Sequence, residues 1–306
     1  MAYSTITKPS DYFNTKLYTG NGGTNAITGV GFQPDWLWIK DRGSTYYHYI
    51  QDAVRSSDNV IFSNGTDAAQ DYPNAIQSFD TDGFTTGSQG ATNNNSNNFV
   101  SWNWKAGTTG SGTTGQSKDY QYSVNTTSGF SIVRYKGSGV TDHKIPHHLG
   151  AKPEAILVKS TESVHNWTCY RDIFQNSQNY VRLNTNDAVA SDATKWGGYA
   201  TASTINLGSA NDTNQSSSSY NFVAYRFVSK QGYSKIGSYV GNGNNHQDGT
   251  FVYTGFKPAF ILLKPSSASG NWFIFDSKRE GFNVANDYLS PNLTTAEVTN
   301  IRLDLL

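Results

Sequence analysis

The segment Gly31-Phe-Gln-Pro-Asp-Trp-Leu-Trp-Ile-Lys40 places a proline ahead of an apolar run that ends in a lysine. The same order returns in Gly150-Ala-Lys-Pro-Glu-Ala-Ile-Leu-Val-Lys159 and in Gly255-Phe-Lys-Pro-Ala-Phe-Ile-Leu-Leu-Lys264. Such short apolar runs predict strands that are buried on both faces, and proline is tolerated at the first residue of a strand. Because the three prolines lie 119 and 105 residues apart, we predict three copies of one β unit.

Other landmarks recur around each apolar run. They are the Tyr-x-Gly turns Tyr18–Gly22, Tyr135–Gly139 and Tyr239–Gly243, and the asparagines Asn64, Asn184 and Asn292 in later polar turns. Two copies end with an alternating aromatic strand, Asn98–Trp104 and Asn221–Phe227. In the first of these strands Phe99, Ser101 and Asn103 alternate with the apolar residues Val100, Trp102 and Trp104, so we predict that one face of the strand meets water.

Each copy spans about 105–120 residues, the size of a whole β-sandwich domain. The predicted fold is all-β, with tandem antiparallel β-sandwich (jelly-roll-like) units strung in series. The predicted division is 1–106 for repeat 1, 107–119 for a flexible Gly/Ser/Thr linker, 120–229 for repeat 2 and 230–306 for an incomplete repeat 3. Repeat 3 has no closing aromatic strand, so we expect the chain to continue beyond Leu306.

Composition agrees with β structure and excludes several functional classes. Aromatic residues make up 14 % of the chain, and such residues favour strands. Twenty-three basic residues balance 23 acidic ones, so no basic field attracts nucleic acid. The single Cys169 excludes a disulfide within the chain and a Cys-based zinc site. No apolar run approaches the ~18 residues of a membrane helix, so we expect no membrane insertion.

Two motifs faintly resemble metal sites. Asp80-Thr-Asp-Gly-Phe84 resembles the start of a calcium loop but lacks the later ligands, and Asp-Gly is typical of a hairpin turn. His143, His147 and His148 cluster near Asp142, but the other two copies carry Asn, Thr and Gly there. We therefore predict a hairpin turn and an exposed loop, with no metal site and no cofactor.

An acid closes the aromatic stretch after each apolar run, at Asp52, Asp172 and Asp276. A glycoside-cleaving site would need a second carboxylate at a fixed spacing, and none recurs. We interpret these acids as structural groups that accept turn N–H groups at strand ends, so no catalytic residue is predicted.

A sugar-binding surface needs exposed aromatic rings and amides, which meet the apolar faces and the hydroxyls of a sugar. Most tryptophans lie in predicted core strands. The candidate glycan or receptor residues are Trp196 and the amides of an expected solvated loop tip, Asn93, Asn94 and Asn95.

Three repeated patterns carry a family resemblance: Tyr-x-Gly-Asn-Gly, Gly-Phe-x-Pro followed by an apolar run and Lys, and Asn-Phe-Val-x-Trp-x-Trp-Lys. The match is carried by Tyr18–Gly22, Gly31–Lys40, Asp80–Ser88 and Phe99–Lys105 in the first copy, and by Gly232–Gly243 and Gly255–Lys264 in the third. The chain resembles tandem-repeat virion structural proteins, described as tail-fibre-like, of tailed bacteriophages, especially marine and cyanobacterial phages. The second copy departs, because Leu149-Gly-Ala replaces Gly-Phe-x. The resemblance implies a structural role and supplies no catalytic residue.

We therefore expect a non-enzymatic bacteriophage virion protein, located in the virion as a tail fibre or tail-fibre-associated component that contributes to host attachment. The alternatives are a capsid decoration or head-fibre protein, and a glycan-binding module of a tailspike. The expected partners are other virion proteins of the tail or capsid, further copies in a homo-oligomer such as a trimer, and a host-surface glycan.

Overall fold

The computed structural model describes residues 4–172, 176–216, 221–244, 248–281 and 283–306. Strands dominate the described residues, and their two α-helices have four residues each. Every strand pairing given for these residues is antiparallel. The predicted all-β fold of antiparallel sandwich-like units is confirmed.

Unit 1 builds two sheets that pack face to face. Its elements are η1 (Pro9–Asp11), β1 (Phe13–Thr19), β2 (Asn25–Thr28), β3 (Trp36–Asp41), β4 (Tyr49–Asp52), β5 (Ser56–Phe62), β6 (Gln70–Asp71), β7 (Ile76–Asp80), β8 (Gly83–Thr86), α1 (Gly90–Asn93) and β9 (Asn98–Trp104). The large sheet has the order β1-β9-β3-β4-β5-β6, and the small sheet has the order β2-β8-β7.

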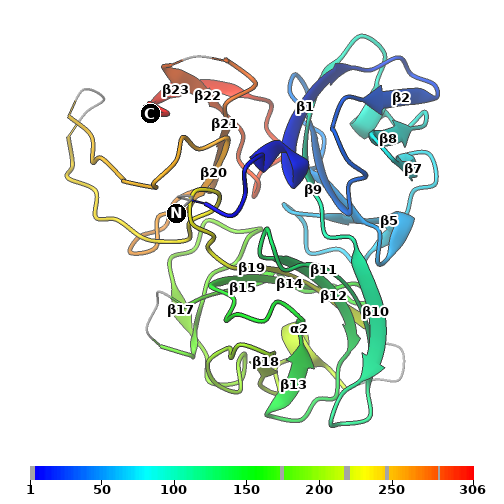
Figure 1. Cartoon of the computed structure of the whole chain (residues 1–306), viewed down its shortest axis with the longest axis vertical. Coiled ribbons are helices and arrows are strands. Elements are labelled where there is room, and N and C mark those ends of the chain that lie inside the picture. Colours follow the sequence, from blue (N-terminus) through cyan, green and yellow to red (C-terminus); the bar gives the residue numbers. More distant parts are fainter. Residues whose placement is uncertain (1–3, 173–175, 217–220, 245–247, 282) are drawn as a thin grey trace.

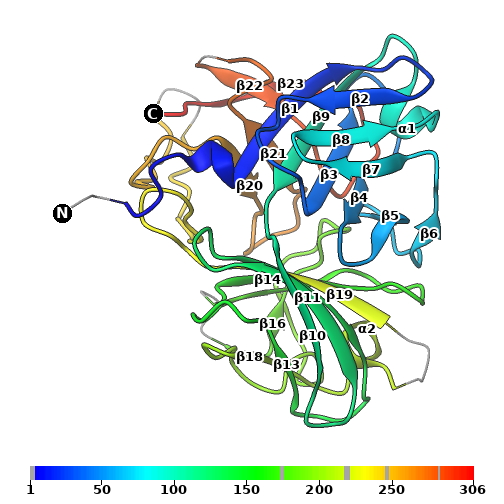
Figure 2. The same cartoon turned by 45° about the vertical axis from the view of Figure 1, so that its right-hand side comes forward.

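Unit 2 repeats this plan. Its elements are β10 (Thr108–Thr113), β11 (Asp119–Asn125), β12 (Phe130–Lys136), β13 (His143–Pro146), β14 (Ala155–Ser160), β15 (Thr168–Arg171), β16 (Asn179–Tyr180), β17 (Ala190–Ser191), β18 (Thr204–Leu207), α2 (Asn211–Asn214) and β19 (Asn221–Phe227). The large sheet has the order β10-β11-β12-β19-β14-β15, and β13-β18 and β16-β17 form pairs. In Figure 2 the large sheet lies between the β13-β18 pair and the other two units.

The expectation of a flexible linker over residues 107–119 is wrong for Thr108–Thr113. These residues form β10, an edge strand that pairs with β11 along its whole length. Gly110 and Gly112 lie opposite Tyr122 and Tyr120, and the tyrosine rings occupy the space that a Cβ would need at each glycine. The glycines therefore make room for rings, which the Gly-rich composition alone did not indicate.

Unit 3 contains β20 (Phe260–Leu263), β21 (Phe273–Asp276), β22 (Ala285–Tyr288) and β23 (Val298–Leu303). These strands form the pairs β20-β21 and β22-β23. They are the counterparts of β3, β4, β5 and β6 in unit 1. Pro34, Pro153 and Pro258 are all buried and stand two residues before Trp36, Ala155 and Phe260, so this landmark holds the same place relative to the first paired strand of each copy.

The strand β3 confirms the prediction of strands that are buried on both faces, whereas the prediction is wrong for β20, whose four residues are only half-buried. Leu37 and Ile39 join an apolar cluster between the two sheets of unit 1. Trp36 and Trp38 point to the opposite face and enter a second cluster. All six residues of β3 are buried, because its sheet is covered on both sides.

The same double coverage overturns the expectation that one face of the closing strand β9 meets water. Ser101 and Asn103 are fully buried. Asn103 Nδ2 donates to the carbonyl of Asn14 at 2.9 Å, and Ser101 Oγ donates to the carbonyl of Lys16 at 3.4 Å. The polar side chains on this face therefore serve the neighbouring strand β1 instead of solvent.

All three units contribute to one shared core, which lies between the large sheets of units 1 and 2 and the strand pairs of unit 3. Its buried members are Trp36, Trp38, Ile50, Ile61, Val100, Trp102, Trp104 and Ala106 from unit 1, Phe130, Ile132, Leu157, Trp167, Cys169, Val181, Leu183, Val223 and Tyr225 from unit 2, and Trp272, Ile274 and Leu289 from unit 3. Figure 1 shows the units as three lobes around this centre, blue to cyan, green, and yellow to red. The expectation of units strung in series is therefore wrong.

Equivalent backbone bonds close the three units into a ring. The N–H of Ala69 in unit 1 donates to Thr161 in unit 2, that of Val189 in unit 2 donates to Ser266 in unit 3, and that of Glu297 in unit 3 donates to Arg42 in unit 1. The N···O distances are 2.9, 2.9 and 2.8 Å. Each donor holds the same place in its unit and so does each acceptor, so the arrangement has approximate threefold symmetry within one chain.

A second set of contacts follows the same cycle. Trp167 Nε1 of unit 2 donates to the carbonyl of Phe62 in unit 1 at 2.8 Å, and Trp272 Nε1 of unit 3 donates to the carbonyl of Arg182 in unit 2 at 2.9 Å. The counterpart in unit 1 is His48, whose ring interacts with the backbone of Ser290 in unit 3. Burial lowers the pKa of His48 well below its ordinary value, so the ring is neutral at pH 7.

We predict that Trp36→Ala destabilises the chain by about 3–5 kcal/mol, the usual cost of removing a buried aromatic residue. Trp36 stacks on Tyr225 of unit 2, with ring centroids 4.6 Å apart, so the cavity would open between two units. Urea unfolding measures the change. Val140→Ala, at a side chain that is 56 % exposed, is the control and should cost less than about 0.5 kcal/mol. A cost below 1 kcal/mol for Trp36→Ala would contradict the shared core.

Candidate functional site

The recurring asparagines hold one backbone group at the same place in every unit. Asn64 Oδ1 accepts the N–H of His48 at 2.9 Å, Asn184 Oδ1 accepts that of Trp167 at 2.9 Å, and Asn292 Oδ1 accepts that of Trp272 at 3.0 Å. These amides orient the rings that cross to the next unit. Their recurrence therefore reflects architecture.

Asp52 and Asp276 confirm the prediction of strand-end acids that accept turn N–H groups. Asp52 Oδ1 accepts the N–H groups of Val54 and Arg55, at 3.1 and 2.9 Å. Asp52 Oδ2 accepts from Arg55 Nε at 2.5 Å and from the hydroxyl of Tyr225 in unit 2 at 2.6 Å. The carboxylate is fully buried with all its lone pairs directed at donors, which leaves no place for a substrate.

Asp276 repeats this pattern in unit 3. Its Oδ1 accepts the N–H groups of Lys278 and Arg279, and its Oδ2 accepts from Arg279 Nε at 2.6 Å. Trp102 Nε1 of unit 1 completes the set at 3.1 Å. The two acids therefore stabilise the turns of their own units and also connect neighbouring units.

Asp172 does not occupy the equivalent position, so the alignment of the three acids is wrong by one residue in unit 2. The strand register pairs Ala155 with Arg171, whereas Trp36 pairs with Asp52 and Phe260 pairs with Asp276. Arg171 is thus the counterpart of the two acids. The sequence spacing concealed this because unit 2 has one extra residue between its proline and its acid.

Two of the three lysines that end the apolar runs also serve junctions between units, whereas Lys40 donates to carbonyls of its own unit, those of Asp41 and Ser44. Lys159 Nζ donates to the carbonyl of Thr66 in unit 1 at 3.1 Å and to that of Ser160 at 2.9 Å. Lys264 Nζ in unit 3 likewise donates to the carbonyl of Asn186 in unit 2 at 3.3 Å. Burial lowers the pKa of Lys159 to about 7, because carbonyl oxygens solvate an ammonium less well than water does.

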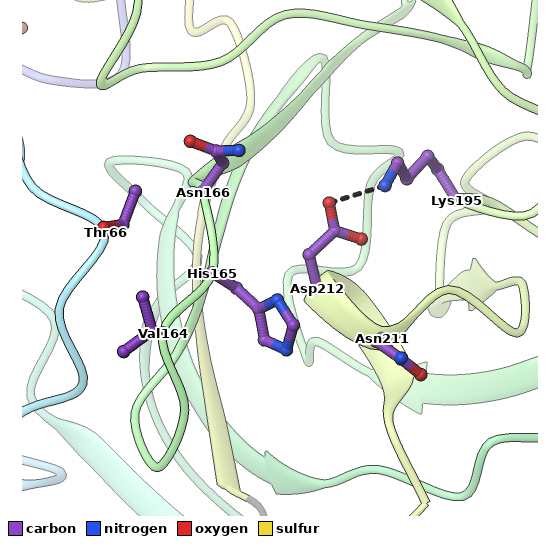
Figure 3. Close-up of a pocket in the computed structure, with 7 residues that line it drawn as sticks. All are labelled: Thr66, Val164, His165, Asn166, Lys195, Asn211 and Asp212. Carbon is purple, nitrogen blue, oxygen red and sulfur yellow. Dashed lines mark hydrogen bonds and ion pairs between the residues drawn. The ribbon is translucent and has the colours of Figure 1, made fainter.

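Beside the Lys159–Thr66 contact lies a pocket of about 260 Å³ at the junction of units 1 and 2 (Figure 3). Its lining residues are Thr66 of unit 1, and Val164, His165, Asn166, Lys195, Asn211 and Asp212 of unit 2. The N–H of His165 donates to the carbonyl of Thr66 at 3.0 Å and fixes the wall between the units. The ring Nε2 of His165 lies 3.1 Å from Gln215 Oε1.

Asp212 is the chemically distinctive group of this pocket. Its Oδ2 accepts from Lys195 Nζ at 2.6 Å and from Thr168 Oγ1 at 2.9 Å, as Figure 3 shows for the lysine. Its Oδ1 is buried and has no hydrogen-bond partner among the described residues. A buried oxygen without a donor is costly, so this atom suits a donor that a ligand brings.

The Lys195–Asp212 pair is not required by the architecture of the unit. Thr92 donates to the carbonyl of Ala75 in unit 1 as Thr213 donates to that of Lys195 in unit 2, so Ala75 and Lys195 are counterparts. By the same alignment Ala91 is the counterpart of Asp212. Two buried alanines thus suffice in unit 1, so the charged pair of unit 2 has no counterpart there.

The side chains that line this pocket are mostly hydrogen-bonding groups. Asp212 is the one carboxylate among its lining residues, so the paired carboxylates of a glycoside hydrolase are not assembled there. Amides, an imidazole and a free carboxylate oxygen match the hydroxyl groups of a neutral polar ligand. In the described part of the chain no group of three or more His, Cys, Asp or Glu residues could hold a metal ion.

The four glycan-binding residues that the sequence predicted differ in their burial in the structure. Asn93 and Trp196 are buried, so their prediction as surface binding residues is wrong. Asn93 Nδ2 donates to the carbonyl of Gly87 at 2.8 Å, and Trp196 packs edge-on against Tyr170. Asn94 and Asn95 are exposed, as expected of a loop tip, but they do not line the pocket of Figure 3.

The two metal-like motifs have structural explanations. Asp80-Thr-Asp-Gly83 connects β7 to β8 as the predicted hairpin turn, and Asp82 accepts the N–H groups of Gly29 and Gly31. The exposed-loop prediction is wrong for His143 and His147, which are buried. His143 belongs to β13, where Nδ1 lies 2.8 Å from Asn214 Oδ1.

The sequence analysis did not identify Lys195, Asp212, Thr66 or His165 as site residues. The pocket residues do not recur between the copies, so the search for repeated landmarks passed over them. The available signal was a difference between the copies instead of a repeated residue. A charged pair in unit 2 at positions where unit 1 has alanines marks a difference that the fold does not need.

One family model, described as Domain of unknown function (DUF7483), matches residues 8–306. Comparison with curated proteins gives no match, and comparison with solved structures gives none either. Within the described ranges, none of the helices has the length and apolar character needed to span a bilayer. The family description assigns no activity, so function rests on the residues above.

We predict that Lys159 gives the chain a pH-dependent stability. Its pKa is about 7 when folded and ~10.4 when unfolded, so between these values the unfolded chain binds more protons. The free energy of unfolding of the wild type, relative to Lys159→Met, should therefore rise by about 2–3 kcal/mol from pH 7 to pH 9. Lys144→Met, at an exposed lysine, is the control and should follow the wild-type slope. Parallel curves for wild type and Lys159→Met would contradict a buried ammonium.

Proposed function

This chain belongs to the family described as domain of unknown function DUF7483, and for it we propose a non-enzymatic structural role in a bacteriophage virion. In this proposal the protein is a tail fibre or tail-fibre-associated component. The phage assignment rests on the resemblance of the Tyr-x-Gly, Pro-apolar-Lys and closing-strand patterns to tail-fibre-like proteins. The structural role rests on what those same patterns do in the molecule.

The observation that carries the structural role is the use of the recurring residues. The lysines at 159 and 264 and the acids at 52 and 276 make contacts between units, and the asparagines at 64, 184 and 292 hold the backbone of the residues whose rings reach the neighbouring unit. A unit that recurs three times with its polar landmarks engaged in this way is organised for rigidity. A particle component needs this property, because it must keep its shape outside the cell.

The proposal predicts that the protein is present in purified particles of a phage whose genome encodes it. Immunogold electron microscopy with antibodies against the purified chain should label the tail. Pre-immune serum and an unrelated phage are the controls. Label confined to the head would support the capsid alternative, and particles without the protein would contradict a virion role.

A glycan-binding activity is the second candidate, favoured by the partnerless Oδ1 of Asp212 in the pocket between units 1 and 2. Asn211 is an exposed amide in the same pocket, and its removal spares the buried pair. Asn211→Ala should lower the affinity for host-surface polysaccharide by about 3–10-fold, which corresponds to one hydrogen bond. Asn95→Ala, at an exposed amide outside the pocket, is the matched control. Equal affinities of all three proteins in a pull-down titration would contradict this site.

A further inference from the structure

Unit 2 presents an exposed sheet edge in the middle of the chain. The first strand of its large sheet, β10, pairs with β11 on one side and with no other strand among the described residues. Figure 1 shows β10 on the outer side of unit 2. The closing strand β19 of this sheet is in place between β12 and β14, so the unit is complete. We call the free side of Thr108–Thr113 the β10 edge.

The hairpin that joins β10 to β11 shows which main-chain groups face outward. The N–H of Thr114 donates to the carbonyl of Lys118 at 2.8 Å, so Thr114 turns its main chain toward β11. Successive residues of an antiparallel strand alternate in this respect. Thr109, Ser111 and Thr113 therefore direct their N–H and C=O groups out of the sheet.

The β10 edge has no device that protects it from pairing. Exposed edges usually carry a charged residue, a proline or a bulge. Thr108–Thr113 contains neither a charged residue nor a proline, and its register with β11 is continuous. Thr109, Ser111 and Thr113 are exposed. The edge is therefore open to another strand.

The sequence of this edge reads the same in both directions. Thr108-Thr109-Gly110-Ser111-Gly112-Thr113-Thr114 is symmetric about Ser111. When two such strands pair antiparallel about a twofold axis at Ser111, each residue lies opposite one of its own type. Hydroxyl residues that lie opposite each other stabilise a strand pair.

We propose that the β10 edge pairs with the β10 edge of a second copy of this chain, antiparallel and centred on Ser111. The interface is isologous, so one sheet continues through both copies. Ser111 would exchange main-chain hydrogen bonds with Ser111 of the partner subunit, and Thr109 with Thr113 of the partner subunit. An unrelated strand is the poorer occupant, because its addition makes no use of the symmetry of the sequence.

The glycine face of the edge agrees with this pairing. The hydroxyls of Tyr122 and Tyr120 lie 2.5 and 2.6 Å from where a Cβ of Gly110 and of Gly112 would be. In the proposed register Gly110 lies opposite Gly112 of the partner subunit. No β10 side chain then separates Tyr122 from the partner subunit's Tyr120, so one phenol can donate a hydrogen bond to the other.

Cross-linking of the full chain tests the register. Ser111→Cys should form a disulfide across the axis, because the Cα atoms of a hydrogen-bonded pair lie ~5.5 Å apart. Thr109→Cys is the matched control on the same edge, since the two copies of Thr109 would lie about 14 Å apart. Non-reducing electrophoresis after mild oxidation should show a covalent dimer for Ser111→Cys alone. The native Cys169 is buried and is not expected to react.

Sedimentation equilibrium of the full chain tests the association itself and should show monomer and dimer. Thr109→Lys combined with Thr113→Lys sets like charges opposite each other and should weaken the dimer about tenfold. Thr109→Lys combined with Thr113→Glu changes the same residues but sets opposite charges there, so the dimer should persist. Ser111→Pro removes an outward N–H in each copy and should weaken the dimer about 10–100-fold, while Ser111→Ala should not.

Three results would overturn the proposal. One is a monomer at every concentration up to the limit of solubility. Another is a dimer, or a larger oligomer, of equal affinity in the two charge variants. The third is equal cross-linking of Ser111→Cys and Thr109→Cys. The charge variants keep the test decisive if Ser111→Pro fails to fold.

Discussion

Burial of both faces of the large sheets of units 1 and 2 is the constraint on which the molecule depends. One face packs on the small sheet of the same unit, and the other carries residues such as Trp36, Trp102 and Tyr225. A lone unit would expose that second face, a patch larger than soluble monomers usually tolerate. Three such faces turned toward each other bury their rings together, and the backbone bonds from Ala69, Val189 and Glu297 fix the cycle.

This constraint also explains the polar residues that recur. Rings that cross from one unit to the next need a fixed origin, which Asn64, Asn184 and Asn292 supply. A carboxylate in a dry interface needs every oxygen satisfied, and Asp52 meets that need with an arginine of its own unit and a hydroxyl of the next. Residues whose side chains suggest catalysis in the sequence are thereby fully engaged in hydrogen bonds that hold the units together.

Local patterns in the sequence predicted much of the fold. Proline followed by apolar residues identified β3, β14 and β20, and Asp-Gly identified the turn between β7 and β8. The pattern could not predict that the units share a core, because a strand buried by its own unit and one buried by a neighbour have the same composition. For that reason the sequence predicted that Ser101 and Asn103 face solvent. The site was less predictable still, since Lys195 and Asp212 meet only through the fold.

Differences between equivalent positions therefore carry more functional information than the repeated landmarks. Every copy must form the contacts that close the cycle of three units, so the residues common to all three copies are explained by those contacts. Unit 2 departs twice, with Lys195 and Asp212 where unit 1 has Ala75 and Ala91, and with Arg171 where the other units have Asp52 and Asp276. Both departures place charge at a junction without a structural need that the other copies share. A chain with a purely structural role would gain nothing from these charged residues, so these positions are the best candidates for recognition of another molecule.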